Sequence, residues 1–177
     1  SVVWGDADGE GTLDLVFGAT ATSVNADLYY NVLGLFPSRL RYEASGFGPH
    51  GLAYGDLDAD GNLDLAFSTP AEVQVYLSGH LTEPDWSVPL LDAQAVAWGD
   101  PDADGDLDLA VGTDGYDLLF LNDGGTLDGA PALTFPRDDD TRSLAWADYN
   151  GDRYLDLATG NYDGPAGVYQ NNRDGTF

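Results

Sequence analysis

Four short acidic stretches hold the side chains of this sequence that could do chemistry. Each stretch places oxygen-bearing side chains at positions 1, 3, 5 and 9 of a nine-residue segment, and the segment recurs about every 47 residues. The four sets are Asp6, Asp8, Glu10 and Asp14; Asp56, Asp58, Asp60 and Asp64; Asp100, Asp102, Asp104 and Asp108; and Asp148, Asn150, Asp152 and Asp156. A period of this length is typical of propellers and solenoids.

Charge repulsion within each stretch points to a divalent cation. Carboxylates crowded into nine residues repel one another unless a cation neutralises them. Calcium accepts six to eight oxygen ligands in loose geometry, whereas magnesium demands a stricter octahedron and zinc prefers nitrogen or sulfur. Position 7 varies freely in side chain, as a main-chain carbonyl ligand would permit; its residues are Thr12, Asn62, Asp106 and Tyr154. The pattern predicts up to four Ca²⁺ ions, one per repeat.

Two other interpretations of the acidic stretches are weaker. An EF-hand would need a Glu at position 12, but that position holds Phe17, Phe67, Val111 and Thr159. A simple solvated turn would use the same residue types, but four copies with fixed internal spacing argue against it. The fourth copy departs most, with Arg153 at the usual glycine position, and we expect it to be the weakest site.

Short apolar runs flank every acidic stretch and predict β-strands on both sides. One run precedes each stretch and one follows it, and two further runs complete each period except the last. No stretch has a helical period, and 23 Gly and nine Pro interrupt the runs. The fold class expected is all-β, built from four-stranded antiparallel blades.

This arrangement resembles the FG-GAP or VCBS-type repeats of integrin-like β-propellers, whose blades carry a D-x-[DN]-x-D-G-x-x-D calcium loop between strands. The resemblance covers essentially the whole chain. It implies one propeller or propeller fragment over residues 1–177, with blades near 1–48, 49–92, 93–140 and 141–177, the last lacking most of its outer strand. It also implies that the acidic loops lie on one face of the ring and the ligand-binding loops on the other.

Aromatic residues recur in the strands at equivalent positions. Trp4, Tyr54, Trp98 and Trp146 each stand two residues before a first acidic ligand. Equivalent aromatics in repeats pack more often between blades than against a ligand, so we expect these four to support the acidic loops.

Composition limits the partners. The net charge is −25, and all six basic residues are Arg, which argues against nucleic acid and against anionic membranes. Calcium loops of this size suit the high calcium outside cells, so we expect a secreted or cell-surface protein. The chain has no Met and begins within a repeat, which leads us to expect a piece of a longer protein.

No catalytic set is recognisable, and we expect a binding protein rather than an enzyme. The leading hypothesis is a calcium-binding module for extracellular binding or adhesion to protein or glycan, with His50, Gln94 and Arg142 as a ring of ligand-contacting residues. The alternatives are a purely structural calcium-stabilised scaffold and, third, a fragment of a glycan-degrading enzyme. Because an open propeller leaves strand edges unpaired, we also expect a homodimer that closes an eight-bladed ring head to tail.

Overall fold

A computed structural model shows an all-β chain, as the sequence predicts. The structure describes residues 1–18, 25–37, 39–43, 48–80 and 82–177, with the main chain alone for 25, 39–43 and 137–139. These residues contain strands and turns and no helix. All strand pairs are antiparallel, as strands joined by short turns require.

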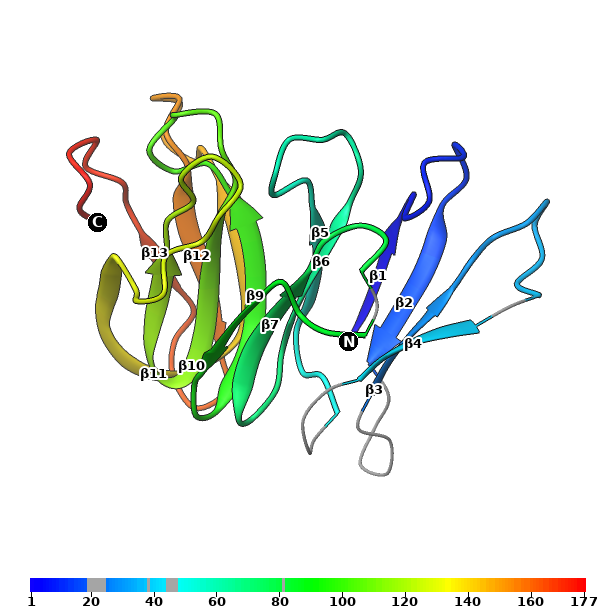
Figure 1. Cartoon of the computed structure of the whole chain (residues 1–177). Helices are drawn as coiled ribbons and strands as arrows, with labels where there is room; N and C mark the ends of the chain where they lie inside the picture. The colour runs from blue at the N-terminus through cyan, green and yellow to red at the C-terminus, as the bar shows by residue number, and fades with distance from the viewer. Residues whose placement is uncertain (19–24, 38, 44–47, 81) are drawn as a thin grey trace.

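Three sheets stand side by side (Figure 1). The first sheet has the order β1-β2-β3-β4, with strands Val2–Gly5, Asp14–Gly18, Asn25–Tyr29 and Arg39–Glu43. The second has the order β5-β6-β7-β8, with strands Leu52–Gly55, Asp64–Ser68, Glu72–Tyr76 and Trp86–Pro89. The third has the order β13-β12-β11-β10-β9, and its strands in chain order are Ala93–Gly99, Asp108–Phe120, Leu133–Ala147, Asp156–Asn161 and Gly167–Tyr169.

The third sheet corrects the expectation of four separate four-stranded blades. Strand β11 pairs with β10 through its first part and with β12 from Thr141 onward, so one continuous strand serves both the third and the fourth repeat. Strand β10 likewise runs through Asp114 and Gly115, which pair with residues of β11. Because β11 pairs with both β10 and β12, the strands of the third and fourth repeats form one five-stranded sheet. The described residues form no closed ring.

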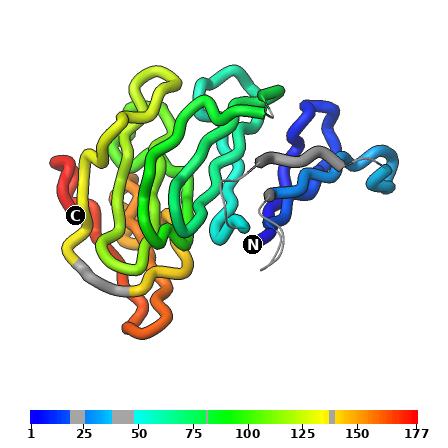
Figure 2. Tube along the Cα trace, turned by 60° about the horizontal axis from the view of Figure 1, so that its bottom comes forward, coloured from blue at the N-terminus to red at the C-terminus, as the bar shows by residue number. Residues whose placement is uncertain are grey.

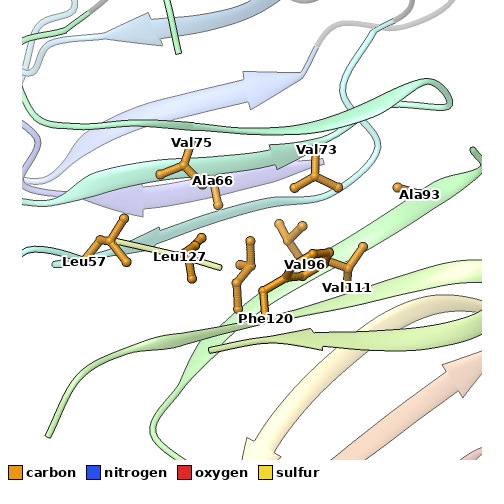
Figure 3. Packing of buried hydrophobic residues seen from close by; sticks show 10 residues of the cluster. Leu57, Ala66, Val73, Val75, Ala93, Val96, Val111, Phe120 and Leu127 are labelled. Carbon is orange, nitrogen blue, oxygen red and sulfur yellow. The ribbon is translucent and has the colours of Figure 1, made fainter. Parts of the chain in front are cut away.

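The hydrophobic core lies between neighbouring sheets. Figure 3 shows Val73 and Val75 of the second sheet facing Val96, Val111 and Phe120 of the third. Four of these side chains are inaccessible to solvent or nearly so. A second cluster joins the first and second sheets in the same way. Sheet-on-sheet packing therefore fixes the spacing of the repeats and of the loops at their ends.

The four turns that join the first and second strands of the repeats all lie along one edge of the row of sheets, the upper edge in Figure 1. The first sheet and the C-terminal segment lie at opposite ends of the row (Figure 2). This arrangement brings the four acidic stretches to one side of the molecule.

Candidate metal sites

The acidic residues at position 9 open the second strand of each repeat and are the most buried members of their sets. Asp14, Asp64, Asp108 and Asp156 have between 0 and 1% of their surface exposed. A buried carboxylate needs hydrogen-bond donors or a cation. The hydrogen-bond donors around each position-9 carboxylate therefore indicate whether a cation is needed in the loop.

In the first three repeats the structure brings together the carboxylates of positions 1, 3 and 9. One oxygen from each lies within 4.8 Å of the others. The three groups are Asp6, Asp8 and Asp14; Asp56, Asp58 and Asp64; and Asp100, Asp102 and Asp108. Oxygens at this separation have the spacing of ligands around one hard cation. The predicted residues at positions 1, 3 and 9 thus converge.

Position 5 lies at the rim of the loop rather than in these groups. The carboxylates of Glu10, Asp60 and Asp104 accept hydrogen bonds from the residue two positions later, which is Thr12, Asn62 or Asp106. Side chains at position 7 thus bond within the loop or to the neighbouring turn. Coordination by position 5 and by the carbonyl of position 7 stays a prediction.

Main-chain N–H groups hold the position-1 carboxylate in every loop. The N–H of the residue at position 6 donates to Asp6, Asp56, Asp100 and Asp148 over 2.8 to 3.1 Å. Three of these donors are glycines with positive φ, a conformation that glycine adopts without steric cost, and the fourth is Arg153 at φ 76°. The loops are therefore shaped before any ion arrives.

Two main-chain donors usually hold the position-9 carboxylate. Its Oδ1 accepts from the N–H at the end of the third strand, at Asn31, Ser78, Asn122 or Asn171, over 2.8 to 2.9 Å. Its Oδ2 accepts from the N–H at loop position 2, which is Ala7, Leu57 or Tyr149. In the third repeat position 2 is Pro101, which has no N–H.

Asp108 consequently carries an orphaned oxygen. Its Oδ2 is buried and has no hydrogen-bond partner among the residues that the structure describes, and the same holds for Oδ1 of Asp6. Burial, together with repulsion from Asp102 and Asp104, raises the pKa of Asp108 from 3.8 to about 7, although the N–H of Asn122 acts against it. Burial also raises the pKa of Asp64. Buried carboxylate oxygens without donors fit a bound cation, so the donor set suits Ca²⁺.

The fourth loop is built differently. Asp152 bonds to the guanidinium of Arg173 at 2.8 and 3.0 Å, and Arg173 also lies over the ring of Tyr154. The main-chain N–H of Tyr154, followed by Arg173, lowers the pKa of Asp152. An Arg side chain from outside the acidic stretch thus neutralises one predicted ligand. The weakness of the fourth site stays a prediction.

Sequence reasoning missed Arg173 and the role of the third-strand Asn residues. The side-chain amide of Asn122 donates to the carbonyls of Leu57 and Leu107, so it ties its own loop to the loop of the preceding repeat. The signal was present, because an Asn recurs after the aromatic third strand in three of the four repeats.

The predicted ligand ring is only partly assembled. The Arg142 guanidinium donates to Gln94 at 3.0 Å and to Asp140 at 2.6 Å, and it lies 5.4 Å from the centroid of the Tyr162 ring. The hydrogen bond that Arg142 donates to Asp140 raises the pKa of Arg142. His50 is exposed and makes no hydrogen bond with Gln94 or Arg142. The structure therefore brings two of the three residues together.

With the loops described, the chain can be compared with known proteins. Residues 100–159, which include the third and the fourth acidic loops, match the FG-GAP-like repeat family. Residues 100–159 carry an FG-GAP-like repeat. This confirms the family predicted from the acidic loops. None of the curated protein sequences is significantly similar to the chain.

Several solved structures have a similar fold. BBS1N, solved in complex with ARL6DN, is 14% identical with a TM-score of 0.68, and the match covers 96% of this chain and 53% of BBS1N. The V. cholerae biofilm matrix protein Bap1 is 22% identical with a TM-score of 0.58, covering 90% of this chain and 23% of Bap1. The Photorhabdus luminescens Tc holotoxin pore is 19% identical with a TM-score of 0.52, and the match covers 99% of this chain and 9% of the holotoxin chain.

These likenesses indicate a β-propeller-like fold. The chain spans about half the length of BBS1N and less of the other two structures. Within the described part of the chain, no helix is long and apolar enough to cross a membrane.

Proposed function

We propose that this chain is a calcium-binding β-propeller module that acts in extracellular binding or adhesion. The observation that carries the calcium proposal is the orphaned Oδ2 of Asp108, which is buried beside Asp100 and Asp102. A buried acceptor without a donor destabilises the fold, and a cation at this position removes both that cost and the repulsion. Bound Ca²⁺ would supply charge neutralisation and folding stability rather than reaction chemistry.

The residues that would hold calcium are the three converging carboxylates of each of the first three loops. Loop position 5 and the carbonyl of position 7 would complete the oxygen shell, as predicted. The fourth loop would bind calcium more weakly, because Arg173 already forms an ion pair with Asp152. We therefore propose three stronger sites and one weaker site.

Calorimetric titration of the EDTA-treated chain with Ca²⁺ tests this proposal. We expect about three tight sites, and we expect Asp108→Asn to lose one of them. Asp163→Asn removes the same charge at an exposed position outside the acidic loops and should leave the number of sites unchanged. An Asp108→Asn chain that binds as many ions as the unmodified chain would contradict the assignment, and an absence of calcium binding would overturn it.

The extracellular assignment follows from calcium and charge. Loops of this kind bind best at the calcium concentrations found outside cells, and the net charge of −25 favours solubility rather than association with nucleic acid. We propose a secreted or cell-surface location. Localisation of the tagged protein in cells would test it.

A ligand would bind on the face opposite the acidic loops, around Arg142. Its guanidinium lies beside the exposed ring of Tyr162 and between Gln94 and Asp140. Planar cations and aromatic rings are common in recognition of proteins and glycans. The alternative is a structural scaffold that binds calcium without any ligand.

A glycan array probed with the calcium-loaded chain separates these possibilities. We expect Arg142→Ala to lose binding to any glycan that the unmodified chain retains. Arg153→Ala removes an equal charge from the acidic-loop side and serves as the control. Binding that is absent for all glycans and for candidate extracellular proteins would favour the scaffold.

A further inference from the structure

The junctions between consecutive repeats share one contact. The first-strand aromatic of the later repeat packs on the glycine that ends the first strand of the earlier repeat, where a methyl group would meet its ring at 2.5 to 2.7 Å. The pairs are Tyr54 on Gly5, Trp98 on Gly55 and Trp146 on Gly99. Atoms cannot approach this closely, so glycine is required at each position.

At each of the two later junctions this contact is accompanied by two hydrogen bonds, one from the tryptophan and one from an Asn. The tryptophan bonds come first. The indole N–H of Trp98 donates to the carbonyl of Ala53, and that of Trp146 donates to Ala97, both over 3.3 Å. Each acceptor lies two residues before the glycine. The other hydrogen bond of each junction is donated by the side-chain amide of the Asn that follows the third strand.

That Asn reaches a carbonyl two residues after the same glycine. Asn122 donates to Leu57 at 2.9 Å, and Asn171 donates to Pro101 at 2.7 Å. A junction is thus defined by a glycine, by a carbonyl two residues before it and by a carbonyl two residues after it.

The first repeat presents the same groups with no neighbouring repeat packed on them among the described residues. Trp4 and Leu13 are 54% and 58% exposed, and the side-chain N–H of Asn31 donates only to Leu13 of its own repeat among those residues. The Leu13 equivalents Leu63 and Leu107 contact the junction glycines. We define the Trp4 face as the surface formed by Val2, Trp4, Leu13, Asn31, Leu35 and Phe36.

Large apolar side chains are unusually exposed on the Trp4 face. Val2 and Leu35 are 61% and 70% exposed, and Phe36, at 40%, lies against the Trp4 ring at 6.3 Å. Contiguous exposed apolar surface of this kind marks an interaction site. Since the same groups are covered at the internal junctions, the occupant that fits is another blade.

The opposite end of the row does not supply that blade. The residue equivalent to the junction glycines in the fourth repeat is Ala147, which is exposed. Its methyl group occupies the space that an incoming tryptophan ring takes at Gly55 and Gly99. A second copy would therefore meet a steric block if its Trp4 approached this end.

We propose that the Trp4 face docks a blade of the same type whose first strand ends in glycine, and that Ala147 keeps the fourth repeat of a second copy from occupying it. Trp4 would lie over the glycine of that blade and donate to the carbonyl two residues before it. Asn31 would donate to the carbonyl two residues after it. The expected head-to-tail homodimer does not close through this junction as long as Ala147 is present.

Sedimentation equilibrium of the purified chain with calcium tests the proposal. We expect Ala147→Gly to strengthen self-association at least tenfold and Trp4→Ala in the same chain to remove that gain. Ala166→Gly is the control, because Ala166 is an exposed residue of the same repeat and lies outside the junction. Thermal unfolding of each variant shows that it is folded.

The result that would overturn the proposal is self-association that Ala147→Gly does not change, or a gain that persists in the Trp4→Ala chain. Asn31→Asp in the Ala147→Gly background is a second check, since a carboxylate cannot donate to the carbonyl and should lower association. It keeps the test valid if the Trp4→Ala chain is unstable.

Discussion

The side-chain amide of Asn171 donates a 2.7 Å hydrogen bond to the carbonyl of Pro101, 70 residues earlier in the chain. The same amide also reaches Leu155 in its own repeat. One side chain thereby holds two acidic loops at a fixed separation.

Replacing Asn171 with Ala should lower the free energy of unfolding by about 1–3 kcal/mol, because two buried carbonyls lose their donor. Chemical denaturation with calcium present measures this. Asn172→Ala, an exposed neighbour that bonds only Thr176 through its amide, is the control and should change stability much less. Equal effects of the two variants would show that the link between the loops contributes no stability.

Pro101→Ala should stabilise the calcium-free chain. The new N–H can reach Oδ2 of Asp108, as the N–H of Leu57 reaches Asp64. A hydrogen bond to a charged group contributes about 1.5–3 kcal/mol, and the loss of proline rigidity subtracts about 0.4–1 kcal/mol. The melting temperature in EDTA should therefore rise.

Pro131→Ala, at an exposed proline outside the acidic loops, controls for the loss of rigidity. A melting temperature in EDTA that falls equally in both variants would mean that the orphaned oxygen does not limit stability.

Without calcium, stability should fall as pH rises from about 4 to about 7. The folded chain holds a proton on Asp108 up to a pKa of about 7, whereas the unfolded chain releases it near 3.8. Between these values the folded state binds more protons, so the free energy of unfolding decreases with pH. Raised pKa values at Asp64 and Asp102 act in the same direction.

Melting curves in EDTA across this range measure the slope, and Asp108→Asn should flatten it. Calcium should oppose the trend, because metal ligands must be deprotonated. A melting temperature that climbs with pH in EDTA would be inconsistent with a protonated Asp108.

Gly99→Ala should destabilise the chain by about 1–3 kcal/mol, since its methyl group would lie 2.5 Å from the Trp146 ring. Gly129→Ala is a matched control, because nothing lies within 4 Å of the added methyl group and φ is not positive. Denaturant unfolding of both variants compares them. A Gly99→Ala chain as stable as the control would mean that the junction adapts easily.

Arg173→Gln should strengthen calcium binding at the fourth loop. The substitution removes the guanidinium that bonds to Asp152 and frees a carboxylate oxygen. Calorimetry should then resolve a tighter additional site, with the first three unchanged. Arg153→Gln, an exposed Arg of the same loop, shows whether the lost charge alone explains the gain. Identical calcium titrations of the Arg173→Gln and unmodified chains would show that Arg173 does not compete with Ca²⁺ for Asp152.

The acidic loops were predictable because their ligands are local in sequence. Asp56, Asp58 and Asp64 lie within nine residues, and the flanking strands fix the ends of that segment. The all-β class and the position of the loops at strand junctions followed from the same local patterns.

Three other features were not predictable in this way. Arg173 reaches Asp152 only because the segment after β13 folds back beside the fourth loop. The orphaned oxygen of Asp108 depends on Pro101, a residue at a position that otherwise tolerates any side chain. The merging of strands at Asp114 and Gly115 reflects pairing with β11, which residue propensities do not encode.

The continuity of β11 makes the last two repeats one cooperative folding unit. Its first half is hydrogen-bonded to β10 and its second half to β12, so opening the fourth repeat disturbs a strand on which the third depends. By contrast, β8 and β9 are separate strands with residues 90–92 between them. Amide protons of the third and fourth repeats should therefore exchange with solvent through shared opening events, while those of the first repeat open independently.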